Sequence, residues 1–193
     1  MAKRKPAKKK TTKRAMASKT TRRSAPKRAP KAKAKAKPRA MAAAASATGS
    51  KATPYICVKG GAAAIDFYTQ AFGAVENMRI TAPDGSLGHA DIQIEGAQIM
   101  LSDEFPDGGV FSPQTLGGSP VSIHLYVRDV DAFAKRALAA GATEERAVAD
   151  QPYGDRSGTL RDPFGHRWMV ATRKEEVSKE EMERRFGGAF LVT

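Results

Sequence analysis

The chain has 193 residues, with 33 Lys and Arg against 20 Asp and Glu, and a formal net charge of +13. No apolar run approaches the roughly 18 residues that a membrane-spanning helix needs, so we expect no contact with a membrane. The single cysteine, Cys57, excludes an internal disulfide and is typical of a reducing compartment, so we expect a cytoplasmic protein.

The charge is distributed unevenly along the chain. Residues 1–51 carry 19 of the 33 basic residues and no acidic residue, which leaves residues 52–193 with a net charge of −6. The basic segment contains no aromatic residue and no Leu, Ile or Val, so it cannot bury enough apolar surface to offset the entropy of folding. We therefore expect residues 1–51 to be a disordered basic tail with a neutral linker, AMAAAASATGS, near its end.

Three interpretations of this tail remain open. The first is nonspecific binding to DNA or another polyanion and association with the nucleoid, which needs charge density but no defined geometry. The stretch KAKAKAKP resembles the Lys/Ala/Pro-rich tails of linker histones and histone-like bacterial proteins. The second is a targeting peptide, and the third is a solubilising extension. The cations that we expect to contact phosphates are Lys8, Lys9, Lys10, Arg22, Arg23, Lys33, Lys35 and Lys37.

The first half of the remaining chain predicts one helix among four strands. In AAAIDFYTQAF, residues Ile65, Tyr68 and Phe72 recur at helical spacing, and Gly73 is suited to end the helix. Turn residues separate β-prone runs around it. The expected strands cover residues 53–58, 75–81, 87–95 and 97–102.

The second half repeats this pattern after an 18-residue loop rich in Gly and Pro, DEFPDGGVFSPQTLGGSP. A helix, DVDAFAKRALAAG, is capped by Asp129 or Asp131, and RDPFG forms a tight turn in which the Asp162 side chain caps the backbone. The expected strands cover residues 121–127, 143–148, 158–161 and 167–172.

Two successive β-α-β-β-β patterns indicate internal duplication. We predict an α+β fold in which two βαβββ modules, about residues 53–103 and 120–173, form a curved mixed sheet around a shared cavity. The expected domain covers residues 52–175. Residues 176–193 form a C-terminal helix and tail, with a capping box at Ser178 and Glu181.

The motifs carry a resemblance to a known family. Paired βαβββ patterns with AIDFYTQAFGA and DPFGHRW resemble the vicinal oxygen chelate superfamily of glyoxalase I, extradiol dioxygenases and bleomycin or fosfomycin resistance proteins. GHADIQIEGAQIMLSDE, GGSPVSIHLYVRDVDAF and YGDRSGTLRDPFGHRWMVAT are similar to its PhnB-like branch. The resemblance implies a homodimer and a cavity in which four strands hold a divalent metal open to substrate oxygens.

The residues at the four ligand positions that the resemblance implies are Thr53, Met100, Ser122 and Met169. None of them is a carboxylate or an imidazole, and thioethers are poor ligands for hard or borderline cations. This favours a protein without a metal cofactor that binds a small molecule, as a resistance protein does. The alternative is a metal-dependent lyase, isomerase or dioxygenase with a displaced site. Its candidate ligands are His89 and His124, with Glu104, Asp103 or Asp91.

Strand alternation places Ser122, His124 and Tyr126 on one face, which should line the cavity. We expect Trp168 either in the cavity or in the core, and Arg156 either at a ligand or in an ion pair with Asp155. His166 is expected to be exposed in its turn. The cavity candidates are Met100, Ser122, His124, Tyr126, Tyr153, Arg156, Trp168 and Met169.

Overall fold

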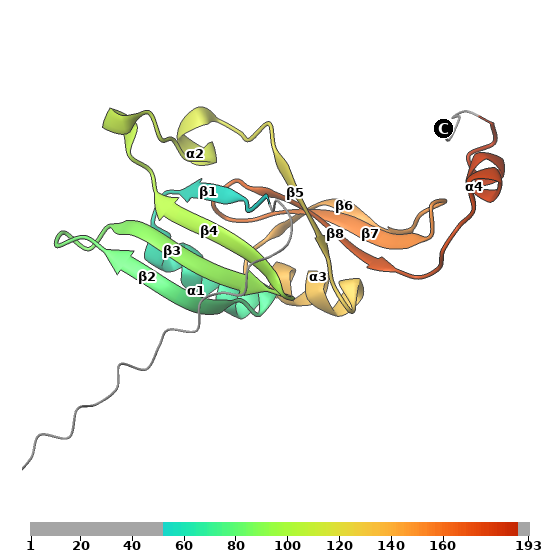
Figure 1. Ribbon diagram of the computed structural model, residues 1–193, viewed down its shortest axis with the longest axis horizontal. Helices are drawn as coiled ribbons and strands as arrows, with labels where there is room; N and C mark the ends of the chain where they lie inside the picture. The colour runs from blue at the N-terminus through green and yellow to red at the C-terminus, as the bar shows by residue number, and fades with distance from the viewer. Residues whose placement is uncertain (1–51, 189–193) are drawn as a thin grey trace, which may run out of the picture. The chain divides into compact units, whose positions relative to one another are not determined.

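The computed structural model describes residues 52–188 (Figure 1), so the tail cations named above lie outside the described residues. The described chain forms two four-stranded mixed sheets, with strand orders β1-β4-β3-β2 and β5-β8-β7-β6. The first module comprises β1 (Tyr55–Val58), α1 (Gly61–Phe72), β2 (Val75–Thr81), β3 (Leu87–Ile94) and β4 (Ala97–Asp103). The second comprises β5 (Ser122–Tyr126), α3 (Val130–Ala139), β6 (Thr143–Asp150), β7 (Asp155–Arg161) and β8 (Arg167–Arg173).

The predicted α+β class and its duplication are confirmed. In each module the first strand pairs in parallel with the last, and the other neighbours are antiparallel. Tyr55 is opposite Met100 in the first sheet, and His124 is opposite Met169 in the second. The two pairs therefore occupy equivalent positions in the two modules.

Several boundaries differ from the expected ones. Strand β7 begins at Asp155 rather than at residue 158, because Asp155, Arg156 and Ser157 all pair with β8. The long loop holds a 3-10 turn, η1 (Pro106–Gly108), and a short helix, α2 (Pro113–Leu116). The terminal helix α4 (Lys179–Arg185) begins as predicted, since the Ser178 hydroxyl accepts a hydrogen bond from the Glu181 amide.

Each sheet packs one of its two faces against the helices α1 and α3. On β4, Ile99 and Leu101 are buried toward α1, whereas Met100 between them is half-buried on the opposite face. The two helices lie next to each other (Figure 1), with the Phe72 and Phe133 rings stacked at 4.9 Å. Among the described residues, α1 and α3 cover one face of each sheet and leave the opposite face without a helix packed across its centre. We call this uncovered side the open face.

The modules are joined by a buried carboxylate, Asp162, in the turn before β8. Its Oδ1 accepts hydrogen bonds from the Phe164 and His166 amides at 3.0 and 2.8 Å, as the predicted turn requires. Its Oδ2 accepts from the Tyr68 hydroxyl at 2.7 Å and from the Trp168 indole at 2.9 Å. Helix α1 of the first module is thereby tied to the turn and last strand of the second.

One expectation for this region is wrong, and the core alternative for Trp168 holds. His166 is 8% exposed, and its Nε2 is 2.9 Å from the Cys57 carbonyl oxygen, so the ring bridges the modules instead of facing solvent. Trp168 is fully buried against Tyr68 and Phe72 in the core, so it does not line the cavity. The indole is directed into the core because strand alternation places it opposite to Met169.

Gly165 in the same turn cannot be replaced without strain. Its φ of +90° is unfavourable for residues with a side chain, and an added Cβ would lie 2.9 Å from the Pro113 Cβ. The close approach brings α2 against the turn, where Gln114 Nε2 donates a hydrogen bond to the Pro163 carbonyl.

We predict that Tyr68→Phe lowers the free energy of unfolding by about 2 kcal/mol, because it removes a buried hydrogen bond to a charged group. Burial, followed by the neighbouring Asp162 charge, raises the pKa of Tyr68 well above its usual value, so the hydroxyl stays protonated and can donate. The measurement is urea unfolding of the full chain. Tyr55→Phe is the matched control, since Tyr55 is 53% exposed and should change stability by less than about 0.5 kcal/mol. Equal effects of the two substitutions would contradict the structural role of Tyr68.

Candidate functional site on the open sheet faces

The open face of the second sheet presents two ordered rows of side chains. Pairing across β5, β8, β7 and β6 places His124, Met169, Thr159 and Arg146 in one row. The neighbouring row contains Tyr126, Ala171 and Ser157. Thr159 and Ser157 are 2% and 3% exposed, so their hydroxyls form a polar floor beneath longer side chains.

At one end of these rows, Tyr126, Asp155 and Arg173 form a closed cluster. The Tyr126 hydroxyl donates to Asp155 Oδ2 at 2.9 Å, and Arg173 donates to Asp155 Oδ1 and, at 3.0 Å, to the Tyr126 oxygen. The Arg173 guanidinium carbon also lies 5.5 Å from the centre of the Tyr126 ring. Asp155 is 2% exposed, so the cluster fully compensates a buried charge.

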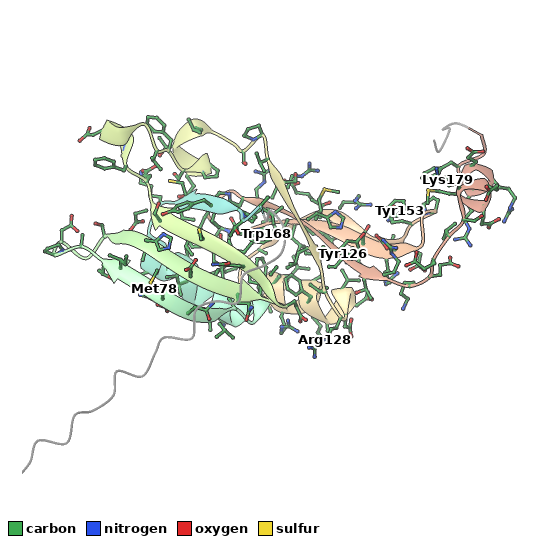
Figure 2. All side chains as sticks on the ribbon, viewed as in Figure 1. Met78, Tyr126, Arg128, Tyr153, Trp168 and Lys179 are labelled. Carbon is green, nitrogen blue, oxygen red and sulfur yellow. The ribbon has the colours of Figure 1, made fainter. Side chains whose placement is uncertain are left out.

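At the other end, Arg146 crosses the polar floor. Its Nε lies 3.4 Å from Thr159 Oγ1 and its Nη2 lies 3.2 Å from Ser157 Oγ. The Tyr153 hydroxyl is 3.4 Å from the same Ser157 oxygen, which brings this loop residue to the site. Figure 2 shows Tyr126 and Tyr153 on the second module, with Trp168 between the modules.

The open face of the first sheet is more apolar. Tyr55, Met100, Asp91 and Met78 form its central row, and the Tyr55 hydroxyl lies 3.0 Å from His89 Nδ1. The large apolar side chains on this face are exposed in a single chain: Tyr55 53%, Val75 60%, Met78 44% and Ile80 56%. Met78 marks this outer strand in Figure 2.

A groove of about 640 Å³ lies where the two modules meet. It is lined by Thr53, Gln98 and His124, among other residues. A shallower depression of about 700 Å³ lies beside Tyr126 and Arg173 and is bordered by Glu95 and Arg128. The structure therefore brings His124 and Tyr126 to accessible surface, with their rings 4.9 Å apart.

Most predicted cavity residues lie on an open face. Tyr153 reaches the site through Ser157, but Arg156 does not reach it. Arg156 is directed to the helix side and donates two hydrogen bonds of 2.7 Å to Asp131 and one of 3.2 Å to Asp150. The ligand-contacting interpretation of Arg156 is therefore wrong. The ion-pair interpretation holds, although the partners are Asp131 and Asp150 rather than Asp155. The cavity candidates found on open faces are Met100, Ser122, His124, Tyr126 and Met169.

The candidate ligands of a displaced metal site have other partners. Glu104 accepts from the Thr115 hydroxyl at 2.6 Å and from the Ser112 hydroxyl at 2.8 Å, and these bonds lower its pKa to about 2. The Asp103 carboxylate accepts from three backbone amides. His89 and His124 lie on different sheets. Within residues 52–188, no three His, Cys, Asp or Glu side chains are grouped as a metal site requires.

The four positions implied by the resemblance do not fit a divalent metal. Met100 and Met169 occupy the centres of the two open faces, Ser122 is paired with Arg167 at one side, and Thr53 precedes β1. Two thioethers and two neutral hydroxyls provide no anionic or imidazole donor. Cys57 provides no reactive thiolate either, because burial, with Glu104 and Asp103 nearby, raises its pKa to about 11.

Sequence reasoning missed Tyr55, Arg146 and Arg173. The signal for Tyr55 is the internal repeat. Tyr55 lies three residues before Val58, and His124 lies three residues before the equivalent Val127. The signal for Arg146 is weak, because β6 reads TEERAVAD without regular alternation and its pairing with β7 contains register shifts.

Two βαβββ modules with open sheet faces define a protein of the glyoxalase type. The chain belongs to the Glyoxalase/Bleomycin resistance protein/Dioxygenase superfamily, whose family model matches residues 47–170. It is 48% identical over 134 residues to an uncharacterized protein of Mycobacterium tuberculosis. The match covers 68% of this chain and 79% of that protein. In the described residues, no helix is long and apolar enough to cross a membrane.

Solved structures share the fold. TioX from Micromonospora sp. ML1 is 25% identical with a TM-score of 0.52, covering 67% of this chain and 100% of that one. The product of an Arabidopsis thaliana gene is also 25% identical, with a TM-score of 0.51 over 64% of this chain and 98% of that one. The fosfomycin resistance protein FosX of Listeria monocytogenes, solved with Mn(II) and sulfate, is 17% identical with a TM-score of 0.50. The match covers 71% of this chain and 97% of FosX. At this identity the likeness to FosX concerns the fold alone.

Proposed function

We propose that this protein binds a small organic molecule without a metal cofactor, as a resistance-like member of the PhnB-like branch. The observation that carries the proposal is the pair of methionines at the centres of the open faces. Met100 and Met169 offer polarizable apolar surface where the resemblance implies metal ligands. Beside Met169, His124 and Tyr126 provide the few polar groups that orient a bound molecule.

We further propose that the working unit is a homodimer, in which a second copy covers the open faces. Three apolar side chains of the outer strand β2, Val75, Met78 and Ile80, are 60%, 44% and 56% exposed in one chain. They lie on the same face of the sheet as Tyr55 and Met100, and the polar β3 residues His89, Asp91 and Gln93 lie between the two groups. Exposed apolar side chains gathered on one strand and rimmed by polar residues are typical of a protein interface.

The metal-independent site predicts that a chelator leaves binding unchanged. The uncharged fluorescent probe N-phenyl-1-naphthylamine should bind the full chain with the same affinity before and after chelator treatment and dialysis. The side chains proposed to contact the probe do so directly, without a metal between them. Lyase, isomerase and dioxygenase assays with added Zn, Ni, Mn or Fe should stay at background. Recovered activity, or stoichiometric metal that is lost in His124→Ala, would instead establish the displaced metal site of the alternative enzyme.

The dimer predicts that a charge on the outer strand prevents association. Ile80→Asp should shift the full chain from dimer to monomer in sedimentation velocity, because the carboxylate would be buried against apolar surface of the second copy. Leu138→Asp is the matched control, since Leu138 is 38% exposed on α3 outside the open face, and this variant should stay dimeric. A wild-type chain that sediments as a monomer at all concentrations would refute the dimer.

We also propose that residues 1–51 associate with DNA independently of the ligand site, a proposal supported by the 19 basic residues of this segment. Affinity for a DNA duplex should fall steeply between about 50 and 200 mM salt, because the bound phosphates release counterions. Deletion of residues 1–50 should abolish the retardation of the duplex in a gel. Unchanged retardation by the truncated chain would show that the tail is not the binding element.

A further inference from the structure

We propose that the ligand carries an anionic group on a planar apolar body, and that Arg146 binds the anion. This inference rests on the proposed function and names the class of molecule that the open face of the second sheet accepts. It is carried by the arrangement of Arg146, Thr159, Met169 and His124 in one row, and by the charges around that row.

Arg146 is an open-face cation without a carboxylate partner in the part of the chain that the structure describes. Its guanidinium is held by two neutral hydroxyls, Thr159 Oγ1 and Ser157 Oγ. Among the described residues it has no carboxylate within the 4.0 Å of an ion pair. The two hydroxyls fix the guanidinium without compensating its charge. Its remaining N–H groups are therefore available to a ligand, in a geometry suited to a carboxylate or sulfonate.

The other arginines of this face are already paired. Arg173 is paired with the buried Asp155 and with Glu176. Arg161 and Arg167 share the single carboxylate of Glu145. The excess of +1 at Glu145 is cancelled by the two carboxylates on Arg173, so the charge that remains on this face is that of Arg146. A cation without a carboxylate partner therefore favours an anion here, although residues 52–193 carry a net charge of −6.

The rest of the row is suited to a planar apolar body. From Arg146, whose guanidinium lies over Thr159 on β7, the row continues to Met169 on β8 and His124 on β5. Two strand spacings correspond to about 10 Å, the length of a molecule with two or three aromatic rings. The thioether of Met169 and the adjacent His124 and Tyr126 rings can contact the faces of such rings.

The test compares two probes of nearly the same shape. 8-Anilinonaphthalene-1-sulfonate carries a sulfonate, and N-phenyl-1-naphthylamine has the same ring framework without it. Both are titrated by fluorescence against the full chain at about 0.15 M salt, where distant exposed charges are largely screened. The variants are Arg146→Met, which removes the charge at similar length, and Arg146→Lys, which keeps it. Arg184→Met is the matched control, because Arg184 is 73% exposed and is paired with Glu181 on α4, outside both sheets.

We expect Arg146→Met to weaken binding of the sulfonate at least about tenfold, or about 1.4 kcal/mol, while the uncharged probe binds as in the wild type. Arg146→Lys should retain part of the preference for the sulfonate, and Arg184→Met should retain all of it. If both probes bind and Arg146→Met weakens neither, the anion inference fails and the binding function stands. If neither probe binds the wild-type chain, the proposed function fails, and the inference fails with it.

Discussion

The buried Asp162 carboxylate is the constraint on which the arrangement of the two modules depends. It accepts four hydrogen bonds, two from its own turn, one from Tyr68 on α1 and one from Trp168 on β8. A carboxylate at 4% exposure is tolerated only when its lone pairs are satisfied, so the turn, the helix and the strand must come together as one unit. Because the Trp168 indole is held in the core, strand alternation directs Met169 to the opposite face. The same bond network that joins the modules therefore sets the centre of the candidate site.

Local patterns in the sequence were sufficient to predict most of the fold. The helical spacing of Ile65, Tyr68 and Phe72, the capping Asp129 and the turn at Asp162 all depend on residues a few positions apart, and all are present in the structure. Long-range partners could not be predicted in this way. Tyr68 and Asp162 are 94 residues apart, and the contact of His166 with Cys57 spans 109 residues. No local pattern distinguishes an exposed turn histidine from one that bridges two modules.

In the candidate site, only those residues could be predicted whose face of the sheet follows from alternation along a single strand. Alternation placed His124 and Tyr126 on one face correctly, but it also shows why Trp168 and Met169 could not both line the cavity, since adjacent residues in a strand face opposite sides. The wrong prediction for Arg156 has the same cause. Its neighbours Asp155 and Ser157 occupy the open face, so Arg156 must face the opposite side. Arg146 required the register of β6 against β7, which is shifted twice by irregular pairing. A period counted along the sequence does not determine such a register.

Methionines at the positions where the resemblance implies metal ligands determine how the proposed site would select a molecule. A metal concentrates charge at the centre of a cavity, whereas Met100 and Met169 leave both centres neutral and polarizable. On the second sheet the charge lies at the edge instead, where two buried hydroxyls hold Arg146 in place. The Tyr126, Asp155 and Arg173 cluster compensates its own charges, so it shapes the wall without adding a strong field. On the proposed function, an apolar centre with the Arg146 cation at its edge selects molecules by shape and charge together.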